Sequence, residues 1–147
     1  MQAFILDLEN RPGSWADVAE KIAQRDVNIL GYGLTADGRG FVGLVGSDEN
    51  ATREALEEVR CKYRQVEILP VTLEHVPGTA AKLARTLAKA GINIDFFMPT
   101  GESGGQTVFA LGVDRIEEAR RILGSQVTNT YGSLWPRAIA GATTQRG

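Results

Sequence analysis

The feature of this chain that most constrains its fold is an internal repeat. The segment Leu8–Gly13 (LENRPG) recurs 65 residues later as Leu73–Gly78 (LEHVPG), and Asp26–Ile29 recurs at the same spacing as Gly91–Ile94. Between residues 8 and 29, nine of 22 residues are identical to their counterparts. Because a repeat of this length encodes one structural unit per copy, it predicts two similar units within the chain. A site at their junction would then occur twice.

The repeat divides the 147 residues into a first unit at 1–67, a second unit at 68–132 and a C-terminal tail at 133–147. A unit of this size buries a thin core and is only marginally stable alone, so we expect an interface between units or a dimer. The tail is rich in Gly, Ala and Thr and is predicted to be partly disordered. Trp135 is its exception, because a large aromatic side chain usually packs against something.

Within the first unit, the apolar run at 3–8 predicts a buried strand that ends at the Pro-Gly break. A helix follows, with one apolar face at i, i+3, i+4, i+7 and i+8, formed by Trp15, Val18, Ala19, Ile22 and Ala23. The remaining elements are strands at 27–34 and 41–45, a helix at 50–59 and a strand from residue 63 to 66. The order βαββαβ is the ferredoxin-like pattern, an α+β fold.

The second unit repeats this order with strands at 68–73, 92–98, 108–113 and 127–131 and a first helix whose apolar face spans 80–88. Asp114 is expected to cap the second helix, with Glu117 completing a capping box. Residues 63–73 must supply the last strand of one unit and the first strand of the next. Pro70 in this stretch predicts a sheet edge or a strand break.

Composition excludes several classes of protein. The formal net charge is −2, and Lys and Arg are scattered, whereas a nucleic-acid module needs a concentrated positive face. The sequence has no stretch of 18 apolar residues to span a membrane, and its start does not resemble a signal peptide. Cys61 is the only cysteine, so no intrachain disulfide can form. We expect a cytoplasmic protein.

Little in the sequence points to catalysis. The chain has one histidine, His75, besides its one cysteine, so neither a nucleophilic triad in both copies nor a histidine-cysteine metal site can be built. No phosphate-binding GxxxxGK[ST] loop is present, and the glycine-rich Gly101–Gly105 lies between two strands and predicts a turn. We therefore predict no catalytic residue, no metal and no cofactor.

The two Pro-Gly loops are the first candidates for binding. Each ends a strand and opens a helix, and either it only turns the chain or it presents free helix N–H groups to a carboxylate. Asn10 in the first loop adds an amide that both donates and accepts. His75, its counterpart, is either a polar equivalent or an exposed loop residue. Free amino acids carry both a carboxylate and an ammonium, which neutral amides suit well.

Asn28 and Asn93 are the second candidates. Asparagine is disfavoured within strands, yet it occupies the same place in both copies, 18 residues after Asn10 and His75. Each is either a turn residue between helix and strand or a second amide that faces a ligand.

These motifs together resemble the ACT domain family, and in particular small stand-alone proteins made of two ACT domains. The resemblance rests on Glu9–Gly13 with Asp26–Ile29 and on His75–Gly78 with Gly91–Ile94, and covers about residues 2–131. It implies antiparallel sheets that pair side by side into a larger sheet with helices on one face. It also implies a free amino acid bound at that junction. Serine-binding members carry a histidine where Leu8 stands here, which argues against serine.

The resemblance implies two crossed sites. One combines the first loop with the second-strand start of the other unit, namely Asn10, Pro12, Gly13 and Ser14 with Asn93 and Ile94. The mirror site combines His75, Pro77, Gly78 and Thr79 with Asn28 and Ile29.

Three hypotheses follow. The first is a non-catalytic regulatory protein that binds a small free amino acid, forms a homodimer through its exposed sheet edges and acts on an unknown enzyme. The second is a structural or protein-interaction ACT module without ligand, which acts through its sheet edge. The third is an enzyme of the ferredoxin-like dimeric-barrel kind, which the lack of convergent acid and base residues disfavours.

Overall fold

The computed structural model describes residues 1–128, so the predicted tail and Trp135 lie outside the described residues. The chain divides into two compact units, an N-terminal unit, Gln2–Val66, and a C-terminal unit, which runs from Glu67 onward and includes Met1. The elements are β1 (Gln2–Glu9), α1 (Ser14–Ala23), β2 (Ile29–Ala36), β3 (Arg39–Gly46), α2 (Glu49–Glu58), β4 (Lys62–Glu74), α3 (Thr79–Lys89), β5 (Ile94–Ser103), β6 (Gln106–Val113), α4 (Ile116–Leu123) and the 3₁₀ turn η1 (Gly124–Gln126).

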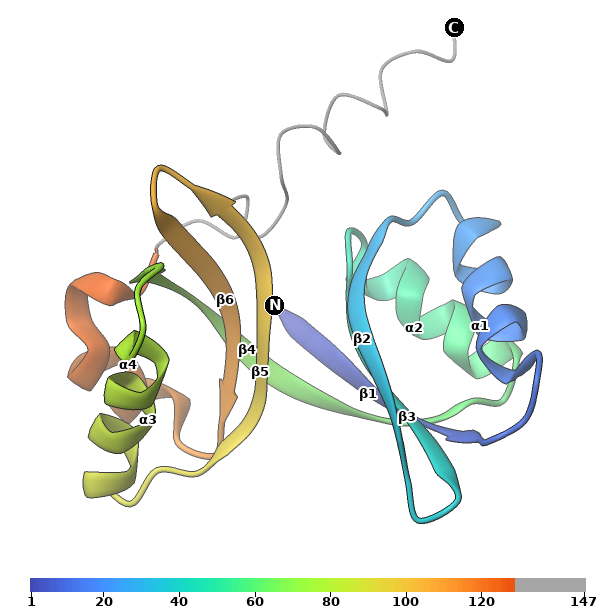
Figure 1. Cartoon of the computed structure of the whole chain (residues 1–147). Helices are drawn as coiled ribbons and strands as arrows, with labels where there is room; N and C mark the ends of the chain where they lie inside the picture. Colours follow the sequence, from blue (N-terminus) through green and yellow to red (C-terminus); the bar gives the residue numbers. More distant parts are fainter. Residues whose placement is uncertain (129–147) are drawn as a thin grey trace, which may run out of the picture. The chain divides into compact units, whose positions relative to one another are not determined.

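Each unit is an antiparallel sheet with two helices on one face (Figure 1). The strand order is β2-β3-β1-β4 in the N-terminal unit and β4-β6-β5 in the C-terminal unit, and the long strand β4 contributes to both. The predicted α+β class with two ferredoxin-like units is therefore confirmed.

The periodicity of the sequence explains the cores. Alternate residues of β1 point to the helix-covered face, so Phe4 and Leu6 are fully buried, and Val18 and Ile22 meet them from one side of α1. In the C-terminal unit the same pattern buries Leu69 and Leu111. Each unit thus has its own hydrophobic core.

Pro70 does not break the strand as the sequence suggested. It lies inside the continuous strand β4, opposite Ala110 of β6. Its carbonyl accepts a hydrogen bond of 2.9 Å from the backbone N–H of Thr128. Because the nitrogen and carbonyl of one strand residue point to the same side, the missing N–H faces Thr128 and the β6 ladder loses nothing.

The expected last strand at 127–131 is seen only where it begins. Within the described residues it consists of a bridge between Val71 and Val127 and the bond from Thr128. Residues 129–131 lie outside the described part of the chain.

The two asparagines of the repeat sit in matching backbone arrangements. The N–H of Asn28 donates to Ser47 Oγ (3.0 Å), and the Asn28 carbonyl accepts from the Ser47 N–H (2.8 Å). In the C-terminal unit the N–H of Asn93 donates to Asp114 Oδ1 (2.9 Å), and its carbonyl accepts from the Asp114 N–H (3.2 Å). The predicted Asp114 capping box is therefore wrong: α4 is preceded by Arg115, and Asp114 anchors the start of β5.

Candidate functional site

The Pro-Gly loops have the same conformation in both units. Gly13 has φ 89° and Gly78 has φ 95°, a left-handed conformation that glycine adopts without a steric penalty. Each precedes a helix that lacks a side-chain cap. The start of each helix therefore presents backbone N–H groups with no carbonyl partner inside the helix.

The N-terminal unit contains a cavity of about 710 Å³ beside the start of α1. This volume lies within the usual range of small-molecule sites, roughly 300–1,000 Å³. The cavity is bounded by the end of β1, the first loop, the first turn of α1 and the edge of β2 and β3. Its lining residues are Leu8, Glu9, Asn10, Arg11, Ser14, Trp15, Ile29, Gly31, Tyr32, Gly33, Leu34, Thr35, Gly40, Phe41 and Val42.

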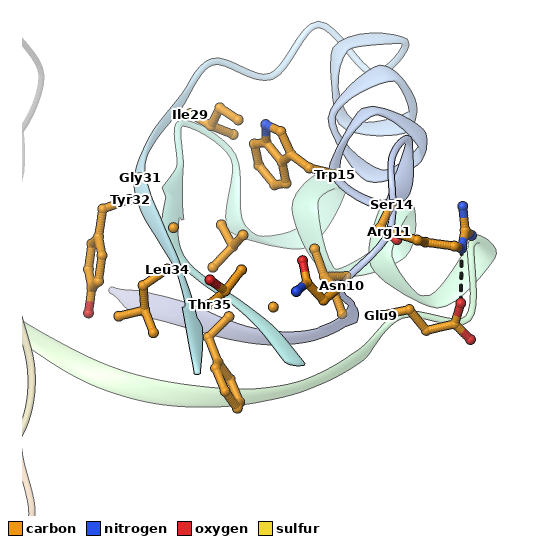
Figure 2. A pocket seen from close by; sticks show the side chains of 15 residues that line it. Glu9, Asn10, Arg11, Ser14, Trp15, Ile29, Gly31, Tyr32, Leu34 and Thr35 are labelled. Carbon is orange, nitrogen blue, oxygen red and sulfur yellow. Dashed lines mark hydrogen bonds and ion pairs between the residues drawn. The ribbon is translucent and has the colours of Figure 1, made fainter. Parts of the chain in front are cut away.

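One end of this cavity is polar. Figure 2 shows the Asn10 amide and the Thr35 hydroxyl at this end, with the first turn of α1 beside them. Ser14, at the start of α1, is 8% exposed, and its hydroxyl has no hydrogen-bond partner within the described residues. A buried polar group without a protein partner is uncommon, and the binding of a water or an ion is one usual reason for it.

The other end is apolar. The Trp15 indole extends from α1 toward Ile29 on β2 (Figure 2). Gly31 and Gly33 face the same side of the sheet as Ile29, because alternate strand residues share a face. Val42 of β3 lies opposite Gly33. The wall is therefore formed by an indole, aliphatic side chains and bare backbone.

The charged lining residues compensate one another. Arg11 Nε lies 2.9 Å from the carboxylate of Glu9, and both side chains are more than half exposed. Figure 2 shows this pair on the outer side of the loop, away from Trp15. The cavity consequently has no uncompensated charge at its apolar end.

In the C-terminal unit, side chains of the corresponding loop form hydrogen bonds within the unit. His75 Nδ1 lies 2.9 Å from Thr107 Oγ1 and 3.4 Å from the carboxylate of Glu102. The Thr79 hydroxyl, the counterpart of Ser14, lies 2.8 Å from the Glu74 carbonyl and 3.0 Å from that of Val76. The Thr79 hydroxyl therefore has hydrogen-bond partners, whereas the Ser14 hydroxyl has none among residues 1–128.

Thr79 also lines a different cavity, of about 600 Å³, within the C-terminal unit. Its lining residues are mainly polar, namely Thr72, Leu73, Glu74, Thr79, Lys82, Gln106, Ser125, Gln126 and Thr128.

Among the predicted site residues, the structure brings Asn10, Ser14 and Ile29 to one cavity of the N-terminal unit. Pro12 and Gly13 form the loop between the first two. Asn28 is exposed, and the Asn93 amide donates to Asp95 Oδ1 at 2.8 Å. Ile94 packs against the core of the C-terminal unit, where Pro77 and Gly78 are exposed loop residues. The predicted crossing of loops and asparagines between units stays a prediction.

Sequence reasoning missed the apolar wall of the cavity. Trp15 was predicted to lie on the apolar face of the first helix with Val18 and Ile22, which are buried, whereas Trp15 is 39% exposed. Gly31 and Gly33 lie on one face of β2, and glycines within a strand often mark a place where another group approaches closely. The i, i+2 spacing of these two glycines is the sequence signal that could have indicated this open wall.

Other chemistry has little support in the described part of the chain. No group of three or more His, Cys, Asp or Glu side chains in residues 1–128 is arranged to hold a metal ion. Burial, followed by the charge of Asp7, raises the pKa of the Cys61 thiol to about 11, so the thiol is protonated at neutral pH. Of the helices described, none is long and apolar enough to cross a membrane.

No protein-family model and no curated protein matches the chain. Solved structures do match. Protein BT0572 from Bacteroides thetaiotaomicron is 18% identical with a TM-score of 0.73, and the match covers 86% of this chain and 88% of that one. The regulatory subunit of aspartate kinase from Thermus thermophilus is 20% identical (TM-score 0.57, covering 85% and 90%). That from Thermus flavus is 22% identical (TM-score 0.58, covering 83% and 86%). These regulatory subunits are ACT-domain proteins, so the chain has the fold of a tandem ACT-domain protein.

Proposed function

We propose that this chain is a non-catalytic regulatory protein that binds a small free amino acid. The observation that carries the proposal is the polar end of the N-terminal cavity. There the Ser14 hydroxyl, which has no partner in the described part of the chain, lies at the start of α1, and the Asn10 amide comes from the loop before it. The same fold occurs in regulatory subunits of aspartate kinase, which supports a regulatory role.

The carboxylate of the ligand fits the start of α1. The N–H groups of Trp15 and Ala16 follow the N-terminal residue of the helix and have no intrahelical carbonyl, and the helix dipole favours a negative charge there. A bond from Ser14 to the carboxylate would remove the penalty of an unsatisfied buried donor, about 1–3 kcal/mol. The side-chain oxygens of Asn10 and Thr35 would accept from the ligand ammonium.

We further propose that the site is completed at the junction between ACT domains. One site combines Asn10, Pro12, Gly13 and Ser14 with Asn93 and Ile94, and its mirror combines His75, Pro77, Gly78 and Thr79 with Asn28 and Ile29. A ligand that contacts both sides favours the paired state, which is how its binding would be transmitted to a regulated enzyme in the cytoplasm.

A thermal-shift measurement against the twenty amino acids tests this proposal. At a ligand concentration 100 times Kd, binding adds about 2.7 kcal/mol, which raises Tm by several degrees. Asn10→Ala and Asn93→Ala should each abolish the rise if both contact one ligand, and Asn50→Ala, an exposed asparagine on α2, should retain it. A flat panel would reject amino-acid binding, and a full response in Asn93→Ala would reject only the crossed pairing.

The exposed edge of β2 favours the second candidate function, an interaction module that acts through its sheet edge. Within the N-terminal unit, β2 pairs only with β3, and its Tyr32 and Leu34 side chains are 43% and 50% exposed. An unpaired strand edge can add a strand from a second copy. Analytical ultracentrifugation at increasing protein concentration tests for this homodimer. If the protein dimerises but no amino acid raises its Tm, this second candidate function is favoured.

A further inference from the structure

The two copies of the repeat differ most at the cavity wall, and the sheet registers show how. Gly31 of β2 lies opposite Leu44 of β3, and Phe97 of β5 lies opposite Leu111 of β6. Leu44 and Leu111 are equivalent, because they lie opposite Phe4 and Leu69, which are 65 residues apart. The structural counterpart of Gly31 is therefore Phe97 and not Phe96, the residue 65 positions later.

Irregularities in β5 cause this offset. Its register against β6 shifts between Ile94 and Phe96 and again between Pro99 and Gly101, whereas the pairing of β2 with β3 is regular. A bulge adds one residue to its strand and changes which side chain faces the core.

Aromatic rings occupy this place in the C-terminal unit. Phe97 stacks on Phe109 with ring centroids 4.4 Å apart and an interplanar angle of 4°, and both rings pack against the hydrophobic core. The registers make Val42 the counterpart of Phe109. In the N-terminal unit, a glycine and a valine therefore stand where the other copy has two phenyl rings.

Gly31 cannot itself fill the space. A Cβ built on Gly31 would lie 2.8 Å from the carbonyl oxygen of Gly43. A side chain at position 31 would clash with the backbone of β3, so this position requires glycine. The volume beside Gly31 is therefore open to a ligand.

The remaining wall suits a ring as well. Trp15, whose counterpart in the repeat is Ala80, adds an indole that the C-terminal unit lacks. Aromatic pairs gain energy beyond the area they bury. The nearest charges, Glu9 and Arg11, pair with each other, and a charged ligand side chain would be buried against apolar groups at a large cost.

We propose that the amino acid bound by the N-terminal unit has an aromatic side chain, whose ring takes the place that the Phe97 ring takes in the C-terminal unit. This inference rests on the proposed function. It adds that the ring lies between Trp15, Ile29 and Val42, while the carboxylate lies at the start of α1. Amino acids with small or charged side chains would leave this volume empty or bury a charge.

The test is calorimetric titration of the full chain with phenylalanine, tyrosine and tryptophan, compared with glycine, serine, aspartate and lysine. Trp15→Ala, which copies Ala80, should weaken aromatic binding at least about tenfold. Ile122→Ala on α4 is the matched control, because Ile122 is also 39% exposed, and it should leave binding unchanged. Val42→Phe, which copies Phe109, should place a ring in the space beside Gly31 and abolish aromatic binding.

The outcomes separate the two proposals. If no amino acid binds the wild-type chain, the proposed function fails and this inference with it. If only small or charged amino acids bind, the function stands and the aromatic inference is overturned. It is also overturned if Trp15→Ala, or a folded Val42→Phe chain, binds phenylalanine with wild-type affinity.

Discussion

Gly46 and Thr52 form a contact in the N-terminal core that allows a sharp test of packing. A Cβ built on Gly46, at the end of β3, would lie 2.0 Å from Thr52 Oγ1 and 3.3 Å from a Val27 methyl carbon. Thr52 is fully buried in α2, and its hydroxyl donates to the Asp48 carbonyl at 2.6 Å. Gly46→Ala therefore requires the hydroxyl to move within a closed core.

The size of the effect follows from two terms. Forcing an extra methyl group into a packed core costs about 1–3 kcal/mol, and losing the Thr52 hydrogen bond adds about 1 kcal/mol. We expect Gly46→Ala to lower the free energy of unfolding by about 2–4 kcal/mol, measured by urea denaturation with circular dichroism.

The second copy of the repeat suggests the compensating change. By register and helix start, the counterparts of Gly46 and Thr52 are Val113 and Ala119, both buried. There the strand residue is large and the helix residue small. Thr52→Ala should therefore relieve Gly46→Ala, so that the double variant is more stable than Gly46→Ala alone by about 1 kcal/mol or more.

The control is Gly33→Ala in β2, whose Cβ would have its nearest neighbours at 3.5 Å. It should change stability by less than about 0.5 kcal/mol. The reasoning is refuted if Gly46→Ala is equally mild, or if the effects of Gly46→Ala and Thr52→Ala simply add.

Two further predictions concern the loops and the thiol. Gly13→Ala and Gly78→Ala should each destabilise the chain by about 1–3 kcal/mol in the same urea assay, because both positions have φ near 90°, and an unchanged midpoint would contradict the loop conformation. Burial raises the pKa of Cys61 from 9.0 to about 11, so its alkylation by iodoacetamide at pH 8 should be about 100-fold slower than that of an ordinary thiol and rise steeply to pH 11. Because the folded state binds the thiol proton more tightly than the unfolded state does, the contribution of the protonated Cys61 to the free energy of unfolding is complete below about pH 9 and is lost as pH rises toward 11. Fast alkylation of the folded chain at pH 8 would contradict the raised pKa.

Much of the fold could be predicted from local physical chemistry. The helical spacing of apolar residues predicted that Val18 and Ile22 lie on the buried face of α1, and both are buried. The apolar run at 3–8 predicted a buried strand, in which Phe4 and Leu6 are fully buried. The Pro-Gly pairs predicted the turn into each helix. These signals act over a few residues, so they survive without tertiary information.

Other predictions failed where a backbone or side-chain group forms a hydrogen bond with a residue far away in the sequence. Asp114 had the position of a helix cap, yet it accepts the N–H of Asn93, 21 residues away. Pro70 was predicted to mark a sheet edge or a strand break. The strand does not break, because the missing N–H of Pro70 faces Thr128, 58 residues away, outside the β6 ladder. The hydrogen-bond partner, which sequence alone does not specify, decided both cases.

The sequence by itself determined that the chain is a duplicated α+β unit with two equivalent loop-to-helix starts, because glycine conformation and hydrophobic period are local properties. The sequence already shows one difference between the two loops, Asn10 against His75, but only the tertiary structure decided how the two copies differ as sites. The register shifts in β5 place Phe97 where the other copy has Gly31. The Thr79 hydroxyl is hydrogen-bonded, whereas the hydroxyl of its counterpart Ser14 has no partner within residues 1–128. Sheet register and side-chain packing are set by contacts between distant strands, so a comparison at constant sequence spacing cannot find them.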